Sequence, residues 1–179
     1  VQPNIPQTLK WNLAQKEDNF RQLLEMTAQP SPLNLKAVIW PETAIPFFLE
    51  QDSFRRMLIA EALPKGALLF TGALRLTGPK EVRNSILVLD KEGTILTSYD
   101  KAHLVPFGEY IPFRKSIDGI FGEGSIKKIT IGTLDFMAGP GPDLVTLPND
   151  FPSFSGLVCY EVIFPCAVVN SAQTRPKWM

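Results

Sequence analysis

The sequence is poor in the residues that build disulfide frameworks and metal centres. Its 179 residues include two cysteines, Cys159 and Cys166, and one histidine, His103. Two cysteines cannot supply a disulfide framework or a four-thiolate zinc site, and a single histidine excludes a site of several imidazoles. Carboxylate-only metal sites have no supporting cluster in the sequence. We therefore expect no metal and no other cofactor, and we expect the two cysteines to remain unpaired.

The sequence also lacks an excess of charge of one sign and a long apolar run. Its 18 basic and 18 acidic residues are scattered and cancel, so it carries no basic stripe of the kind that binds nucleic acid. No run reaches the roughly 18 to 20 consecutive apolar residues of a membrane span. The opening, Val1-Gln2-Pro3-Asn4, has no feature of a signal peptide. The valine start and the end at Met179 lead us to expect a piece of a longer protein.

The composition of the chain is typical of a globular domain. Hydrophobic residues make up 45% and charged residues 20%, which supplies enough apolar material for a core. A length of 179 residues suits one domain. We expect residues 1–179 to form a single domain that is partial and has no membrane-spanning region.

The spacing of apolar residues predicts helices and strands that alternate first, with strands dominating later. Helical spacing predicts helices over 13–27, 47–63 and 162–172. Short apolar runs predict strands over 37–40, 67–74, 83–89, 94–99, 126–131, 143–147 and 155–159, and the alternation over 1–5 is compatible with another. Residues 90–93 predict a hairpin turn, and residues 103–124, rich in Pro, Gly and Phe, predict a long loop. This order of elements indicates an α/β layered fold.

Three residues with reactive side chains stand where predicted strands end. Glu42 follows the strand over 37–40, Lys101 follows the strand over 94–99, and Cys159 ends the strand over 155–159. In open α/β sheets, functional sites gather in the crevice beyond strand ends. The three side chains are therefore candidates for one site, although each has a plainer explanation. A cysteine at the end of an apolar strand is more often a small core residue, and loop charges are usually solvated.

The chemistry of the three residues is coherent if they meet. A thiol with an ordinary pKa of about 8.5 needs a base or a nearby cation to become a nucleophile. Glu42 is suited to take the proton of Cys159, and Lys101 to stabilise the thiolate and an oxyanion. His103 lies two residues from Lys101, and a Cys-His pair built on it has little support. The predicted helix over 162–172 would add positive potential near the thiol.

The segments around these residues resemble the nitrilase superfamily and, within it, the apolipoprotein N-acyltransferase branch. The resemblance rests on three motifs and on the opening of the chain: Trp40-Pro41-Glu42-Thr43-Ala44, residues 99–112 (YDKAHLVPFGEYIP), Cys159-Tyr160-Glu161-Val162-Ile163-Phe164-Pro165, and Gln2-Pro3-Asn4-Ile5-Pro6-Gln7 followed by Lys10-Trp11. It covers nearly the whole chain in the family's order, and the segment around Lys101 is its most specific part.

This resemblance implies a fold and a set of roles. The fold is a nitrilase-like αββα sandwich, here incomplete at the C-terminus. The resemblance makes Glu42 the general base, Lys101 the stabiliser of the oxyanion, and Cys159 the nucleophile.

Four further residues match positions that are important in the family: Glu109, Tyr160, Glu161 and Trp11. Glu109 is a candidate to orient Lys101, and Glu161 is a candidate to position the site. A plain structural salt bridge is the alternative for each of these two carboxylates.

The activity that the resemblance implies is lipoprotein maturation. Such an enzyme transfers an acyl chain from a phospholipid to the N-terminal amine of a diacylated lipoprotein cysteine, through a thioester on Cys159. It sits in the bacterial inner membrane through a region that this chain does not contain, with its catalytic domain facing the periplasm. Two alternatives stay open: a soluble nitrilase-type amidase that hydrolyses a small amide with the same triad, and a binding domain without activity.

Overall fold

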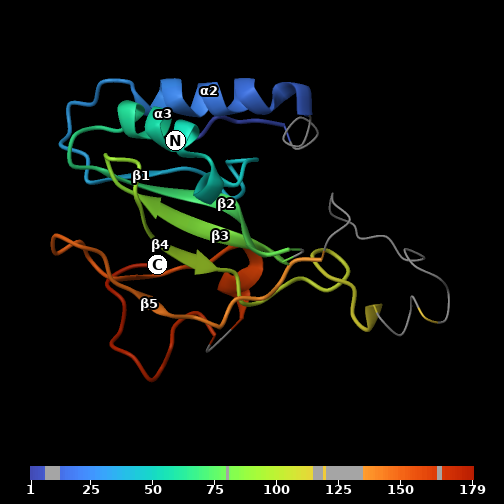
Figure 1. Ribbon diagram of the computed structural model, residues 1–179. Helices are drawn as coiled ribbons and strands as arrows, with labels where there is room; N and C mark the ends of the chain where they lie inside the picture. Colours follow the sequence, from blue (N-terminus) through green and yellow to red (C-terminus); the bar gives the residue numbers. More distant parts are fainter. Residues whose placement is uncertain (7–12, 80, 115–118, 120–134, 165–166) are drawn as a thin grey trace.

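The computed structural model describes the chain except for residues 7–12, 80, 115–118, 120–134 and 165–166 (Figure 1). In chain order the elements are η1 (Leu13–Gln15), α2 (Lys16–Thr27), β1 (Ala37–Ile39), η2 (Leu49–Gln51), α3 (Ser53–Ala62), β2 (Leu68–Gly78), β3 (Glu81–Leu89), β4 (Ile95–Asp100), β5 (Leu144–Val145), β6 (Phe154–Ser155) and η3 (Cys159–Ile163), where η marks a 3-10 helix. Helices and strands are mixed, so the expected α/β class is confirmed.

Four strands form the main sheet in the order β1-β2-β3-β4. β1 pairs parallel with β2, whereas β2, β3 and β4 pair antiparallel. The predicted turn between β3 and β4 is present, because Asp90 Oδ1 accepts the N–H groups of Glu92 and Thr94, at 3.0 and 2.8 Å. Gly93 completes this turn at a φ of +76°, in the left-handed region that glycine adopts most readily. The long β2–β3–β4 meander places its residues on two faces that alternate along each strand.

The two faces of this sheet are covered differently (Figure 1). Helices α2 and α3 lie over one face, where Phe20, Leu23 and Ile59 pack against sheet residues such as Leu69 and Leu87. The small β5–β6 sheet lies on the other face, in a second core that joins Phe70, Val88, Tyr99, Val145, Phe154 and Val158. Burying such a side chain contributes about 1.5–3 kcal/mol. The described residues thus build a helix layer, a central sheet and a second strand layer.

Several predicted elements are confirmed and one is shorter than expected. The helix over 13–27 and the strands over 37–40, 67–74, 83–89 and 94–99 all have counterparts in the structure. The single helix expected over 47–63 is instead η2 followed by α3. The division falls at Asp52, whose side chain caps α3 by accepting the N–H of Arg55 at 2.9 Å.

The helix predicted over 162–172 is wrong. η3 ends at Ile163, and residues 167–172 contain no helix. The residue before a proline is pushed out of the helical region, and Phe164, which precedes Pro165, is extended with φ −86° and ψ 105°. The strand predicted over 155–159 is only Phe154–Ser155, that over 143–147 is only Leu144–Val145, and residues 1–5 form no strand. The strand predicted over 126–131 lies outside the described residues.

Within the described part of the chain, no helix has the length and apolar composition needed to cross a membrane.

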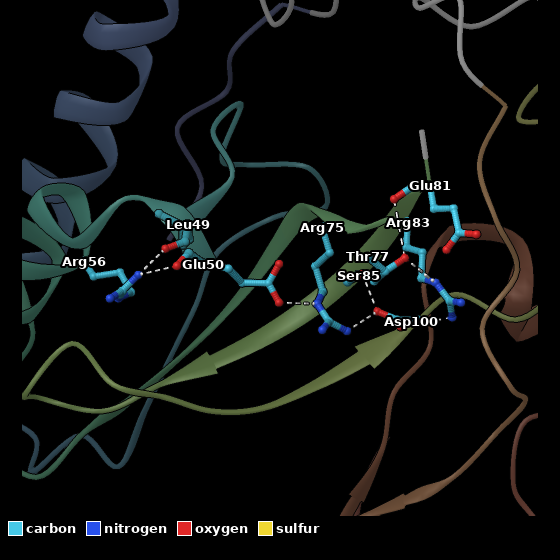
Figure 2. Close-up of polar contacts among 9 residues, drawn as sticks. All are labelled: Leu49, Glu50, Arg56, Arg75, Thr77, Glu81, Arg83, Ser85 and Asp100. Atoms are coloured by element: carbon cyan, nitrogen blue, oxygen red, sulfur yellow. Dashed lines mark hydrogen bonds and ion pairs between the residues drawn. The ribbon is translucent and has the colours of Figure 1, made fainter. Parts of the chain in front are cut away.

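Asp100, at the end of β4, joins three strands on the helix-covered face of the sheet (Figure 2). Its Oδ1 accepts hydrogen bonds from Arg75 Nη1 and Ser85 Oγ, both at 2.7 Å, and its Oδ2 accepts from Arg83 Nη1 at 3.3 Å. Arg75 and Arg83 are directly opposite each other on β2 and β3, where like charges repel. Glu50 neutralises the outer side of Arg75 by a bond to Nε at 2.8 Å. The Asp100 carboxylate therefore holds together the sheet end from which Lys101 follows.

We expect Asp100→Asn to lower the free energy of unfolding by about 1–3 kcal/mol, because two partly buried guanidinium groups then face each other without their shared carboxylate. Urea unfolding with linear extrapolation measures this change. The matched control is Asp18→Asn, since Asp18 pairs with Arg21 on the surface of α2, with both side chains about two-thirds exposed; this change should stay below about 0.5 kcal/mol. Equal effects of the two substitutions would contradict the role given to Asp100.

Candidate active site

Glu42 is placed by the chain segment that leaves β1. Trp40 extends the pairing with β2 through its N–H, which donates to the Phe70 carbonyl at 2.8 Å. The chain then passes so close to β2 that a Cβ on Gly72 would lie 2.6 Å from Glu42 Cα and 2.4 Å from Thr43 N. Only glycine allows this approach. The Glu42 side chain is exposed at this turn, and its Oε1 accepts a hydrogen bond from Asn84 Nδ2 at 2.9 Å.

Lys101 directly follows β4 and is only 1% exposed. A buried ammonium group is costly unless a carboxylate neutralises it. Glu109 does so with both oxygens, which lie 3.0 and 2.9 Å from Lys101 Nζ. Glu109 is itself buried, and its Oε2 also accepts the N–H of Val105 at 2.9 Å. The ion pair therefore fixes the position of the Lys101 side chain. It also fixes the loop between Lys101 and Glu109, because Glu109 binds the backbone of Val105 as well.

Cys159 stands at a sharp change of chain direction. It is the first residue of η3, and it has a φ of +57°. This left-handed conformation is uncommon for a residue with a side chain and stores backbone strain. Cys159 is exposed and is not in a disulfide. The strained turn places Cys159 at the wall of a cavity that Glu42 also lines.

The pKa of the Cys159 thiol shows which groups surround the sulfur. Loss of water around the sulfur is the largest cause and raises this pKa, and the negative charge of Glu42 raises it further. Lys101 and the backbone N–H of Tyr160 act in the opposite direction. The net effect is a raised pKa, so the thiol keeps its proton at neutral pH. Glu42 and Lys101 both act on the charge of the sulfur, and Glu42 and Cys159 line the same cavity, so the structure brings Glu42, Lys101 and Cys159 together.

Glu161 links the Cys159 turn to the Lys101 loop. Its side chain is 1% exposed, and its Oε2 accepts the N–H of Val158 at 2.8 Å, just before the cysteine. Its Oε1 accepts three further bonds, from Ala102 N at 2.8 Å, His103 N at 3.1 Å and Tyr99 Oη at 3.1 Å. Burial and the Glu161 charge raise the pKa of Tyr99, so the hydroxyl stays a donor. One carboxylate thus spans two loops that are about sixty residues apart in the chain.

The contacts of the other predicted residues say less about their roles. Tyr160 is 57% exposed, and its backbone N–H lowers the pKa of the Cys159 thiol. Trp11 lies outside the described residues. His103 stacks on Phe164 with ring centroids 4.8 Å apart, and its backbone, not its ring, makes the 3.1 Å bond to Glu161.

A cavity of about 250 Å³ opens beside the thiol. Cys159 and Glu42 line one part of it, and the rest is largely apolar and aromatic, with Trp40, Phe70, Phe154 and Trp178 among its walls. A reactive pair thus borders a space that suits an apolar group.

Sequence reasoning missed Asn84, Tyr99 and Gly72. Of these three residues, only Asn84 could have been noticed in the sequence, because it is an amide in a strand that is otherwise mostly apolar. The roles of Tyr99 and Gly72 depend on partners distant in the chain, Glu161 and Glu42.

Solved structures with a similar fold include two enzymes. An amidase from Nesterenkonia sp. AN1 aligns at 19% identity with a TM-score of 0.53, over 84% of this chain and 54% of the amidase. A carbon-nitrogen hydrolase from Helicobacter pylori G27 aligns at 16% identity with a TM-score of 0.53, over 85% of this chain and 49% of that protein. The Nesterenkonia amidase belongs to the nitrilase superfamily, so the nitrilase-like fold expected from the sequence is confirmed.

Closer relatives are found by sequence. The apolipoprotein N-acyltransferase of Rhodopseudomonas palustris is 38% identical over 194 residues, and that of Bradyrhizobium diazoefficiens is 36% identical over 191 residues. Both alignments cover 100% of this chain and 34% of the relative, so the chain spans about a third of their length. Residues 1–175 match the carbon-nitrogen hydrolase family. The chain therefore belongs to the carbon-nitrogen hydrolase family.

Proposed function

We propose that this chain is the catalytic domain of an N-acyltransferase that completes lipoprotein acylation. It transfers an acyl chain from a phospholipid to the N-terminal amine of a diacylated lipoprotein cysteine. The observation that carries this proposal is the 36–38% identity, over the whole chain, to proteins named apolipoprotein N-acyltransferase. We further propose that the enzyme works at the bacterial inner membrane, held there by a region outside this chain, with the catalytic domain facing the periplasm.

The first half-reaction forms a thioester. Glu42 takes the proton from the Cys159 thiol as the sulfur attacks the ester carbonyl of the phospholipid. The resulting oxyanion is stabilised by the positive charge of Lys101. When the oxyanion collapses, the carbon–oxygen bond breaks and the departing alkoxide takes the proton from Glu42. The products are a lysophospholipid and an acyl chain bound to Cys159.

The second half-reaction releases the thiol. The neutral N-terminal amine of the lipoprotein attacks the thioester carbonyl, and Glu42 takes the amine proton. The carbon–sulfur bond then breaks, and the Cys159 thiolate regains a proton from Glu42. An amide leaves and the starting thiol is restored. Every proton in the cycle passes through the Glu42 carboxylate, which lines the same cavity as the thiol.

The geometry supports this chemistry at two points. The raised pKa of Cys159 means that the thiolate forms together with proton transfer to Glu42 and is not present beforehand. The apolar cavity beside Cys159 offers walls that match an acyl chain. Amide hydrolysis would use the same thioester with water as the acceptor. It has weaker support, because the aligned amidase is only 19% identical and shows the fold alone.

Replacing Cys159 by alanine should abolish the covalent intermediate. The full chain, incubated with phospholipid vesicles, is expected to gain the mass of one acyl chain, and hydroxylamine should remove it because a thioester is cleaved by this nucleophile. Cys159→Ala should show no gain, whereas Cys166→Ala serves as the matched control and should acylate normally. Intact-protein mass spectrometry with peptide mapping makes the measurement. A stable acyl group on any residue other than Cys159 would contradict the mechanism.

Replacing Glu42 by glutamine should slow acylation by roughly 100-fold or more, because the amide cannot accept the thiol proton. Single-turnover acylation, followed by quenching and mass spectrometry, measures this rate separately from phospholipid binding. Glu25→Gln, which changes an exposed glutamate of α2 in the same way, should leave the rate unchanged. An unaltered rate in Glu42→Gln would remove Glu42 from the role of general base.

A further inference from the structure

Asn84 occupies a place in the sheet where an amide is costly. It lies on β3, is 3% exposed, and has the buried apolar residues Val82 and Val88 on the same strand. In the part of the chain that the structure describes, its Oδ1 is buried without a hydrogen-bond partner. An unsatisfied buried carbonyl destabilises a fold, and an apolar residue of similar size would avoid that cost. Sheet formation therefore does not account for this amide.

The other half of the same amide touches the candidate site. Asn84 Nδ2 donates to Glu42 Oε1 at 2.9 Å. Because a carboxylate can only accept, the amide nitrogen must be the end that faces Glu42. Glu42 also lines the cavity that Cys159 lines, so a bond that fixes this carboxylate also fixes its direction relative to the thiol.

The main chain of Asn84 binds Lys101. Its carbonyl accepts the N–H of Lys101 at 2.9 Å, which continues the β3–β4 pairing by one residue past Asp100. Asn84 is thus bonded to Glu42 through its side chain and to Lys101 through its main chain. One rigid strand position sets the distance between the proposed base and the proposed cation.

We propose that Asn84 is a positioning residue for the acylation reaction: its amide orients the Glu42 carboxylate toward the Cys159 thiol and keeps it ready to accept a proton. This inference rests on the proposed function, in which Glu42 is the general base. Asn84 touches neither the sulfur nor the acyl group in this role. It acts through Glu42 alone.

The test is the dependence of Cys159 acylation on the concentration of 4-nitrophenyl acetate in the full chain, followed by release of 4-nitrophenolate in a single turnover. Asn84→Ala should lower the limiting acylation rate roughly 10-fold or more, the size expected for losing a hydrogen bond to a charged group. The ester concentration that gives half of this rate should change little, because Asn84 acts on Glu42 and not on the ester.

Asn84→Leu separates the donor role from simple space filling. Leucine fills a volume close to that of asparagine but offers no N–H and adds no charge beside Glu42. A space-filling role would make Asn84→Leu faster than Asn84→Ala. The positioning role makes the two variants equally slow. If Asn84→Leu fails to fold, Asn84→Val takes its place, and the same loss of rate is expected.

Leu87→Ala is the matched control. Leu87 lies on the same strand, is 0% exposed, and packs in the helix-covered core on the opposite face of the sheet. Its loss should lower the thermal midpoint of unfolding without lowering the limiting acylation rate. An unchanged rate in Asn84→Ala, or a loss of the same size in Leu87→Ala, overturns the inference.

Two further variants keep this test separate from the test of the proposed function. Cys159→Ala must lose acylation, and Glu42→Gln must acylate roughly 100-fold more slowly or worse. If either variant behaves like the unaltered protein, the proposed function is wrong. If both behave as stated and Asn84→Ala does not, only the role of Asn84 is wrong.

Discussion

The ion pair between Lys101 and Glu109 is the interaction on which the rest of the site depends. The two side chains are 1% and 8% exposed, and both carboxylate oxygens lie about 3 Å from the ammonium group, at 3.0 and 2.9 Å. A lone charge in this position would have to lose its proton or bring in water. The loop after β4 must therefore return Glu109 to Lys101, and the cation is fixed before any substrate arrives.

The buried carboxylate of Glu161 extends this constraint to the nucleophile. It binds the backbone on both sides of the site, at Val158 beside Cys159 and at Ala102 beside Lys101. The thiol then lies between an anion that raises its pKa and a cation that lowers it, with partial loss of water as the larger effect. In the proposed mechanism, such a thiol becomes a nucleophile only when Glu42 removes its proton.

Periodicity predicted much of the fold. The strands over 67–74 and 83–89 appear close to their expected places, because each is largely a buried apolar run bounded by turn residues. The strand over 94–99 is also present, although Tyr99 is its only buried residue. The prediction of a helix over 162–172 was wrong, because the spacing of apolar residues takes no account of the restriction that Pro165 places on the backbone of Phe164. The strand-end positions of Glu42, Lys101 and Cys159 were visible in the sequence. Their convergence depends on contacts between distant segments, which local patterns do not encode.

The same separation, between what the sequence indicates and what only the structure shows, applies to the residues that support the three candidates. Glu109 and Glu161 were selected by resemblance, and only the structure distinguishes their contacts: one neutralises a buried ammonium, and the other binds backbone N–H groups and a tyrosine hydroxyl. Asn84 was not selected at all, because an amide inside a strand has no meaning until its partner, Glu42, is known. The sequence indicated which side chains could take part in a site. The three-dimensional structure showed which groups each of them contacts.

The central claim is that Glu42 raises and Lys101 lowers the pKa of one thiol, that of Cys159. Titration of that thiol tests this claim most directly. In a Cys166→Ala background, the ultraviolet absorbance of the Cys159 thiolate should appear at a pH above the ordinary cysteine range. Glu42→Gln should move this midpoint to lower pH, and Lys101→Met should move it to higher pH. A midpoint in the ordinary range that neither substitution moves would contradict the account.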